Sequence, residues 1–121
     1  MKRNVISMVL LLLLFFVLIG CTAEKYGTAV DRNSKMVKAK DVILNRDLVG
    51  KPVTLEGKIS SQCGSNGCWF VLMDDTGQVF INLAPNNLTV PPRMNKPAKV
   101  MGIVYPVQGE LQIIAQGVEI R

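Results

Sequence analysis

The chain has 121 residues, a length that accommodates one small domain. It carries 14 Lys and Arg against 9 Asp and Glu, and two of the basic residues precede an apolar N-terminal block. The 12 that remain are too few and too dispersed for a nucleic-acid footprint. The sequence contains no His, which excludes His-ligated zinc, His-ligated haem and His-dependent hydrolysis within this chain.

Residues 1–20 have the pattern of a secretion signal. A basic start, Met1–Asn4, precedes the apolar run Val5–Ile19, which is shorter than the ~20 residues of a transmembrane helix. The run ends in Leu18-Ile19-Gly20-Cys21, which resembles a bacterial lipobox, where a signal peptidase cuts before the cysteine and lipid is attached to its sulfur. The resemblance implies a lipoprotein whose Cys21 carries acyl chains such as palmitate. An uncleaved anchor with an incidental cysteine is the alternative.

The residue after the lipobox bears on the compartment. Residue 22 is Thr rather than Asp, and by resemblance to lipoprotein sorting this implies the outer membrane, facing the periplasm, in a Gram-negative host. In a Gram-positive host it implies the outer face of the cell membrane. Lipid attachment at Cys21 leaves Cys63 and Cys68 as an even pair in an oxidising compartment.

Residues 21–37 are expected to be the lipidated cysteine followed by a flexible tether. The segment is polar, mixed in charge and without a helical or strand period, so it buries too little apolar surface to offset its chain entropy. Some 16 residues of flexible chain span roughly 20–25 Å, which would let the domain stand off the membrane. A partner-binding tail is the alternative for this segment.

Residues 38–121 are predicted to form the folded domain. A short helix is expected within residues 37–45, with an edge strand as the alternative. Residues 53–60 alternate between apolar and polar, which is typical of a half-buried strand, and Gly57 marks a sharp bend in it. Further strands are expected at residues 68–73, 78–83, 97–107 and 110–115, with Val118 and Ile120 closing the chain. Residues 84–96 hold too many Pro and Asn for a regular helix.

This order of elements predicts a mainly β fold. A Gly-bent first strand, a three-strand meander, a break and a final hairpin match the five-stranded OB-fold, a Greek-key barrel. Residues 41–45 and 50–59 resemble the opening of the tRNA-anticodon-like OB families of bacteria. The segment Cys63–Phe70 resembles an uncharacterised exported branch of that group, with a Cys and a Gly-Cys-Trp at the same turn. The resemblance covers residues 38–121 and implies the fold, but no defined reaction.

The pair Cys63 and Cys68 is the sharpest feature of the domain. The favoured interpretation is a disulfide that clamps the first β-hairpin, which would contribute ~2–3 kcal/mol for so short a loop. The glycines at 64 and 67 give the backbone freedom to reach the bridge geometry. The alternative is a thiol pair that binds a soft metal such as Cu(I), with Met73 or Met101 as a thioether ligand, or a redox dithiol. The spacing is not the Cys-x-x-Cys of redox motifs.

Trp69, the only tryptophan, shares one face of its strand with Val71 and Met73. Core packing or covering of the cysteine bridge is its favoured role. Otherwise it is a stacking platform on the face formed by strands two and three, where OB-folds bind their ligands. That candidate ligand face comprises Trp69, Val71, Met73 and Phe80.

The functional expectation is a lipid-anchored accessory module that recognises a protein, an envelope glycan or a small ligand. Asp74-Asp75-Thr76-Gly77 reads as a hairpin turn rather than as a carboxylate pair, and no catalytic or phosphate-binding motif is present. We therefore expect no catalysis and no cofactor. The membrane is an expected partner through the lipid, and nucleic acid is not. The alternative function is a soft-metal or redox carrier that uses Cys63 and Cys68.

Overall fold

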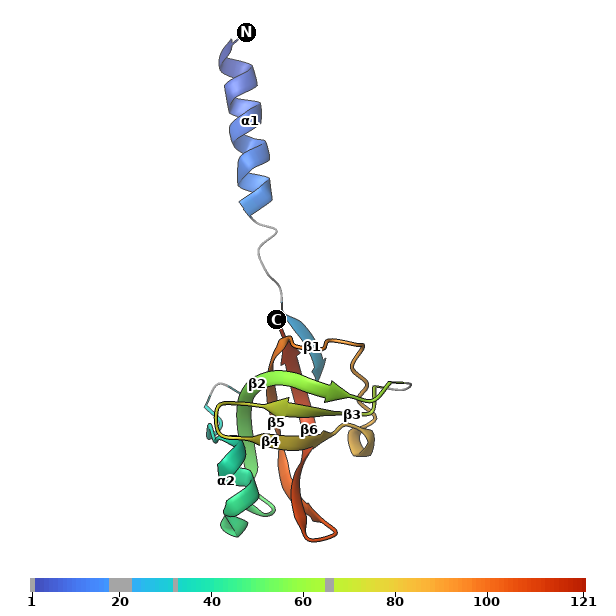
Figure 1. Ribbon diagram of the computed structural model, residues 1–121. Helices are drawn as coiled ribbons and strands as arrows, with labels where there is room; N and C mark the ends of the chain where they lie inside the picture. Colours follow the sequence, from blue (N-terminus) through green and yellow to red (C-terminus); the bar gives the residue numbers. More distant parts are fainter. Residues whose placement is uncertain (1, 18–22, 32, 65–66) are drawn as a thin grey trace.

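The computed structural model describes residues 2–17, 23–31, 33–64 and 67–121 (Figure 1). Cys21 and the rest of the predicted lipobox lie outside the described residues. The first helix, α1 (Lys2–Val17), has apolar side chains that are exposed from Val5 to Leu14. Among the residues that the structure describes, no helix has both the length and the apolar character needed to cross a bilayer.

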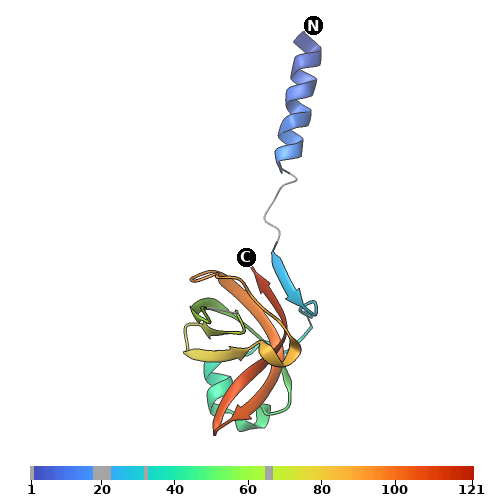
Figure 2. The ribbon, with the colours of Figure 1, turned by 90° about the vertical axis from the view of Figure 1, so that its right-hand side faces the viewer.

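Five strands form a closed barrel (Figures 1 and 2). Strands β2, β3 and β4 make an antiparallel meander, β5 and β6 make an antiparallel hairpin, and β2 also pairs with β5. A short parallel pairing of β4 with β6 closes the barrel. This is the OB-fold topology, so the predicted fold class is confirmed. The strand bounds are Pro52–Gln62 (β2), Trp69–Met73 (β3), Gln78–Asn82 (β4), Pro97–Val107 (β5) and Glu110–Ile120 (β6).

Strand β2 serves two sides of the barrel. Its residues 52–58 pair with β5, whereas residues 58–62 pair with β3. The change of partner falls next to Gly57, where an added Cβ would lie 2.4 Å from the carbonyl oxygen of Met73. Only glycine allows β3 to approach so closely, which explains the bend that the sequence predicts at this position.

The core fills the barrel and extends under the short helix α2 (Ala39–Leu44). Alternate residues of β3 and β4 point inward, and α2, which contacts β4 and β6, buries Val42 fully. The predicted short helix is therefore confirmed. A single 3-10 turn, η1 (Arg46–Leu48), follows α2, and a second, η2 (Ala84–Asn86), precedes the long loop to β5. The largest fully buried side chains are Phe70, Leu55, Ile59, Leu72, Ile81, Leu83, Ile113 and Ile120.

The prediction of a flexible tether was wrong for its first part. Residues Glu24–Gly27 form strand β1, which pairs antiparallel with the end of β6 (Figure 2). Tyr26 packs against the core, and Glu24 accepts a hydrogen bond from Arg93 Nε at 2.9 Å. Backbone pairing and a contact with a residue 69 positions away hold this strand. Neither of these two interactions can be seen in the local hydrophobic pattern, which is why sequence reasoning missed strand β1.

Candidate ligand-binding face and cysteine loop

The alternation of β3 decides which of its side chains face outward. Phe70 is fully buried in the core, whereas Trp69 and Val71 are half-buried and Met73 is 39% exposed. The predicted pairing of Trp69, Val71 and Met73 on one face is thus seen in the structure. Of the two favoured roles of Trp69, core packing was wrong, because Phe70 is the aromatic residue that fills the barrel, whereas covering of the cysteine bridge stays a prediction.

Strand β4 adds an aromatic side chain to the same face. Phe80 is opposite Val71 in the antiparallel register, and it is half-buried while its neighbours Val79 and Ile81 are buried in the core. The rings of Trp69 and Phe80 stack with their centroids 5.3 Å apart and their planes at 26°. Such a pair is worth ~0.5–1.5 kcal/mol beyond area burial, so it also holds the Trp69 ring in place on the surface.

Polar side chains border this apolar face. Gln78 pairs with Met73 across the strands, and its Nε2 lies 3.8 Å from the Met73 sulfur. Asn82 pairs with Trp69, and Ser61 of β2 pairs with Val71. An apolar, aromatic centre with a polar rim is the usual anatomy of a recognition surface. Figure 1 shows β3 and β4 in front of the barrel with no other element over them. We call Trp69, Val71, Met73 and Phe80 the ligand face.

The cysteine loop adjoins one end of this face. The Sγ atoms of Cys63 and Cys68 lie 3.4 Å apart as a thiol contact, whereas a covalent bond measures about 2.05 Å. The backbone N–H of Cys63 donates to the Trp69 carbonyl oxygen at 3.1 Å, which closes the loop on itself. The fold thus brings the two cysteine side chains into contact, and the disulfide between them stays a prediction.

A second segment fixes the position of this loop. The Val90 N–H donates to the carbonyl oxygen of Gly67 at 3.0 Å. Gly67 has a φ of +57°, and an added Cβ would lie 2.2 Å from the Val90 carbonyl oxygen. Only glycine fits this position, because both the backbone conformation and the space exclude a side chain. The orientation of Cys68, next along the chain, is set by that packing.

The Cys68 thiol is not activated. The hydrogen bond to the Cys63 sulfur, together with partial burial and the nearness of the second thiol, raises the pKa of Cys68 above its ordinary value. Reactive redox cysteines need the opposite, a lowered pKa that populates the thiolate. At Cys68 the shift therefore disfavours the thiolate.

The structure does not assemble the metal site of the alternative hypothesis. Met73 ends β3, whereas Cys68 precedes its first residue, so the two lie about 17 Å apart along the strand at ~3.3 Å per residue. Their positions also differ by five, an odd number, which puts the two side chains on opposite faces of the sheet. This arrangement argues against the alternative in which Met73 joins Cys63 and Cys68 as a metal ligand. Within the described part of the chain, no group of three or more His, Cys, Asp or Glu could hold a metal ion.

The adjacent carboxylates have separate structural roles. One oxygen of Asp74 accepts hydrogen bonds from the Thr76 hydroxyl at 2.6 Å and from the Thr76 and Gly77 N–H groups at 2.7 and 3.1 Å. Its other oxygen accepts from the N–H of Ala39, at the start of α2, at 2.8 Å. Asp75 instead pairs with Lys38 at 3.0 Å on the surface. The hairpin turn is as predicted, and it also fastens α2 to the barrel.

These hydrogen bonds set the ionisation of Asp74. Partial burial acts to raise the pKa of its carboxyl, but the hydrogen bonds from Thr76, Ala39 and Gly77 together outweigh it and hold the pKa below its ordinary value. A catalytic acid would need a raised pKa. Asp74 therefore stabilises the turn as a carboxylate.

Sequence reasoning missed two polar anchors of the long loop before β5. The Gln62 amide donates to the carbonyl oxygens of Val90 and Pro91 at 3.0 and 2.7 Å, and its oxygen accepts from the Arg93 N–H at 2.9 Å. The second anchor is Glu24, whose carboxylate accepts hydrogen bonds from Tyr26 and Arg93. These hydrogen bonds lower the pKa of Glu24. Except for Tyr26 and Glu24, the partners in these hydrogen bonds lie far apart in the chain, so no local sequence pattern predicts them.

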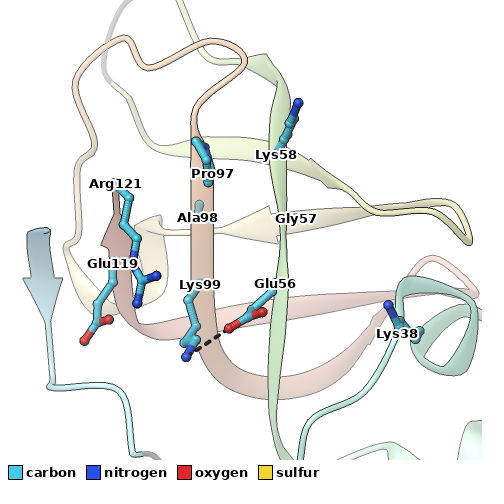
Figure 3. Close-up of a pocket in the computed structure, with 9 residues that line it drawn as sticks. All are labelled: Lys38, Glu56, Gly57, Lys58, Pro97, Ala98, Lys99, Glu119 and Arg121. Atoms are coloured by element: carbon cyan, nitrogen blue, oxygen red, sulfur yellow. Dashed lines mark ion pairs between the residues drawn. The ribbon is translucent and has the colours of Figure 1, made fainter.

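A second candidate site is a polar pocket of about 390 Å³ beside β2 and β5 (Figure 3). Its charged groups include Lys99 and Glu56, which pair at 3.0 Å. Sequence reasoning treated its lysines as a dispersed surface, because Lys38 before α2, Lys58 on β2 and Lys99 on β5 come together only in the fold. The pocket is lined by Lys38, Glu56, Gly57, Lys58, Pro97, Ala98, Lys99, Glu119 and Arg121.

Solved structures support the fold. The chain is similar to the hypothetical protein ygiW from E. coli, with a TM-score of 0.54 and 17% identity, over 78% of this chain and 99% of ygiW. It is also similar to the asparaginyl-tRNA synthetase from Pyrococcus horikoshii, with a TM-score of 0.56 and 19% identity, over 73% of this chain but only 23% of the synthetase. Identities this low establish the shared OB-fold alone. No protein-family model and no curated protein matches the chain.

Proposed function

We propose that this protein is a lipid-anchored, extracytoplasmic binding module that recognises its partner through the ligand face and catalyses no reaction. The observation that carries the proposal is the stacked pair of Trp69 and Phe80, two half-buried rings on the outer face of β3 and β4 beside the exposed Met73. Apolar side chains held in water are costly unless a partner covers them, and aromatic anchors commonly dominate recognition surfaces.

The lipid anchor is supported by the N-terminal sequence. The apolar side chains of α1 between Val5 and Leu14 are exposed, as suits a segment made for an apolar environment rather than for the barrel core. The lipobox-like Leu18–Cys21 follows directly. Several acyl chains on one cysteine would anchor the chain stably, since a single chain gives only marginal membrane binding. The outer membrane or outer cell surface is the proposed location.

The chemistry of the ligand face favours a protein segment, an envelope glycan or a small apolar ligand. Trp69 and Phe80 offer ring faces for stacking, and Gln78 and Asn82 offer hydrogen bonds at the rim. Nucleic acid is not proposed, because several of the basic side chains line the pocket beside β5 rather than this face.

Trp69 is the only tryptophan, so its fluorescence reports directly on the ligand face. We would titrate the protein with muropeptides, as soluble envelope glycans, and follow the emission. In parallel, a photo-crosslinking amino acid at position 71 would trap protein partners in living cells. A saturable emission shift or a discrete crosslinked product is the expected result. Phe80→Ala should then weaken binding by about tenfold, the equivalent of one aromatic contact of ~1.4 kcal/mol.

The matched control is Tyr105→Ala, which removes an exposed aromatic side chain from the β5–β6 hairpin, away from the ligand face. It should leave the emission shift and the crosslinked product unchanged. If neither muropeptides nor cellular proteins respond to the ligand face, or if both variants weaken binding equally, the proposed role of this face is refuted.

A further inference from the structure

Charge is distributed unevenly between the two ends of the barrel. One end, here called the β1 end, comprises the start of β1, the end of β6, the middle of β2 and the loop that leads into β5. The Arg121 N–H donates to the Pro97 carbonyl oxygen at 3.0 Å, and the Asn95 N–H donates to that of Ile59 at 2.8 Å, which joins these segments. The basic residues of the β1 end are Lys25, Lys58, Arg93, Lys96, Lys99 and Arg121, against the acidic Glu24, Glu56 and Glu119.

The opposite end has no such surplus. It comprises α2, η1, the β3–β4 turn and the β5–β6 hairpin, which Figure 1 shows away from the β1 end. Its basic residues are Lys38, Lys40, Arg46 and Lys51, and its acidic residues are Asp41, Asp47, Asp74, Asp75 and Glu110. The formal charge is therefore +3 at the β1 end and −1 at the opposite end.

Strand β1 sets the distance between the domain and the proposed lipid. Because the strand begins at Glu24, only Thr22 and Ala23 separate it from Cys21. Three residue steps of fully extended chain span at most about 10 Å. The tether was expected to hold the domain roughly 20–25 Å from the lipid. With β1 as part of the domain, the distance from Glu24 to the lipid-bearing residue is at most about 10 Å.

We propose that the β1 end lies on the membrane surface, with its basic side chains against the headgroups of anionic phospholipids. The proposal rests on the lipid at Cys21. The chain distance of about 10 Å from Cys21 to Glu24 is comparable with the Debye length at 0.1 M salt, so the headgroup charges still act on residues at this end. Lys58 and Arg121 line part of the pocket beside β2 and β5, which extends toward Lys38 and whose volume of about 390 Å³ leaves room for a phosphate group (Figure 3).

The loop before β5 adds an apolar contact. Met94 is 48% exposed and stands between Arg93 and Lys96. An apolar side chain between two cations suits the boundary between headgroups and acyl chains, where the methionine enters and the cations stay with the phosphates. This orientation also keeps the ligand face open, because β3 and β4 run across the barrel wall rather than at the β1 end (Figure 1).

The test uses the full-length, lipidated protein in vesicles that contain brominated phospholipids, which quench a nearby tryptophan. Met94→Trp and Tyr105→Trp would each be combined with Trp69→Phe, so that each protein has one reporter. Tyr105 is 52% exposed on the β5–β6 hairpin and serves as the matched control. In phosphatidylglycerol vesicles the emission of the Met94→Trp protein should be strongly quenched, and that of the Tyr105→Trp protein should stay unchanged.

Charge removal tests the electrostatic part. Adding Lys96→Gln and Arg121→Gln, or using phosphatidylcholine vesicles, should relieve the quenching at position 94, with circular dichroism showing that the fold is intact. Equal quenching at both positions, or quenching at neither, overturns the orientation. Quenching that persists undiminished in phosphatidylcholine overturns the role of the headgroup charge. A chain that does not stay with the vesicles overturns the lipid anchor and this proposal together, whereas a retained but unquenched chain overturns this proposal alone.

Discussion

Asp74→Ala is expected to destabilise the domain by about 2 kcal/mol. The substitution removes four hydrogen bonds to one carboxylate: two from Thr76, one from Gly77 and one from Ala39. Caps of this kind are worth ~0.5–2 kcal/mol, and hydrogen bonds to charged groups lie at ~1.5–3 kcal/mol. We place the loss near 2 kcal/mol because the group is only partly buried and water replaces some of its partners.

The neighbouring residue supplies the control. Asp75 pairs with Lys38 at 3.0 Å, but the two side chains are 76% and 56% exposed, so Asp75→Ala should cost less than ~0.5 kcal/mol. Urea unfolding of residues 22–121, followed by Trp69 fluorescence, would measure both variants. With a slope of ~1–2 kcal/mol per molar, the midpoint should fall by about 1–2 M for Asp74→Ala and hardly at all for Asp75→Ala.

The pH dependence gives a second readout. The pKa of Asp74 is lower in the folded chain than its ordinary value, so the native state binds this proton more weakly than the unfolded state does. The stabilisation is complete above the unfolded pKa of ~3.9 and is lost as the pH falls through the lower folded value. The gap between wild type and Asp74→Ala should therefore close in acid. Equal losses for the two variants at neutral pH, or a gap that widens in acid, would refute the role assigned to Asp74.

Three further predictions concern the anchor, the cysteines and β1. Cys21→Ser should abolish labelling by a palmitate analogue, and equal labelling of both proteins would contradict a lipoprotein. Purified without reductant, the domain should show no free thiol. Reduction of the Cys63–Cys68 pair should lower the free energy of unfolding by about 2 kcal/mol. A pair that stays reduced and retains Cu(I) against a chelator would restore the metal-carrier hypothesis. A chain that starts at residue 37 should fold without cofactor into a monomer with a β-rich circular dichroism spectrum. It should be less stable than residues 22–121 by ~1–2 kcal/mol, because β1 and its backbone hydrogen bonds are missing; a disordered spectrum would indicate a cofactor-dependent fold.

Local pattern in the sequence determined most of the barrel. A period of two in residues 53–60 and the turn at Asp74–Gly77 report neighbours that are close in the chain, and the structure has the strand and turn where they are predicted. The bend at Gly57 was predictable because a glycine inside a strand marks a close approach, here by the Met73 carbonyl. The same alternation put Trp69, Val71 and Met73 on one face.

Which of the two faces of β3 lies inside was decided only by tertiary structure. Both faces carry apolar residues, so alternation alone does not tell whether Trp69 or Phe70 fills the core. Strand β1 is held by backbone pairing with β6 and by the Glu24–Arg93 ion pair, whose partners are 69 residues apart. Charges that are dispersed along the chain gather at the β1 end for the same reason, since closure of the barrel joins the ends of distant strands. Periodicity reports burial along one element, whereas partners from separate elements meet only once the chain has folded.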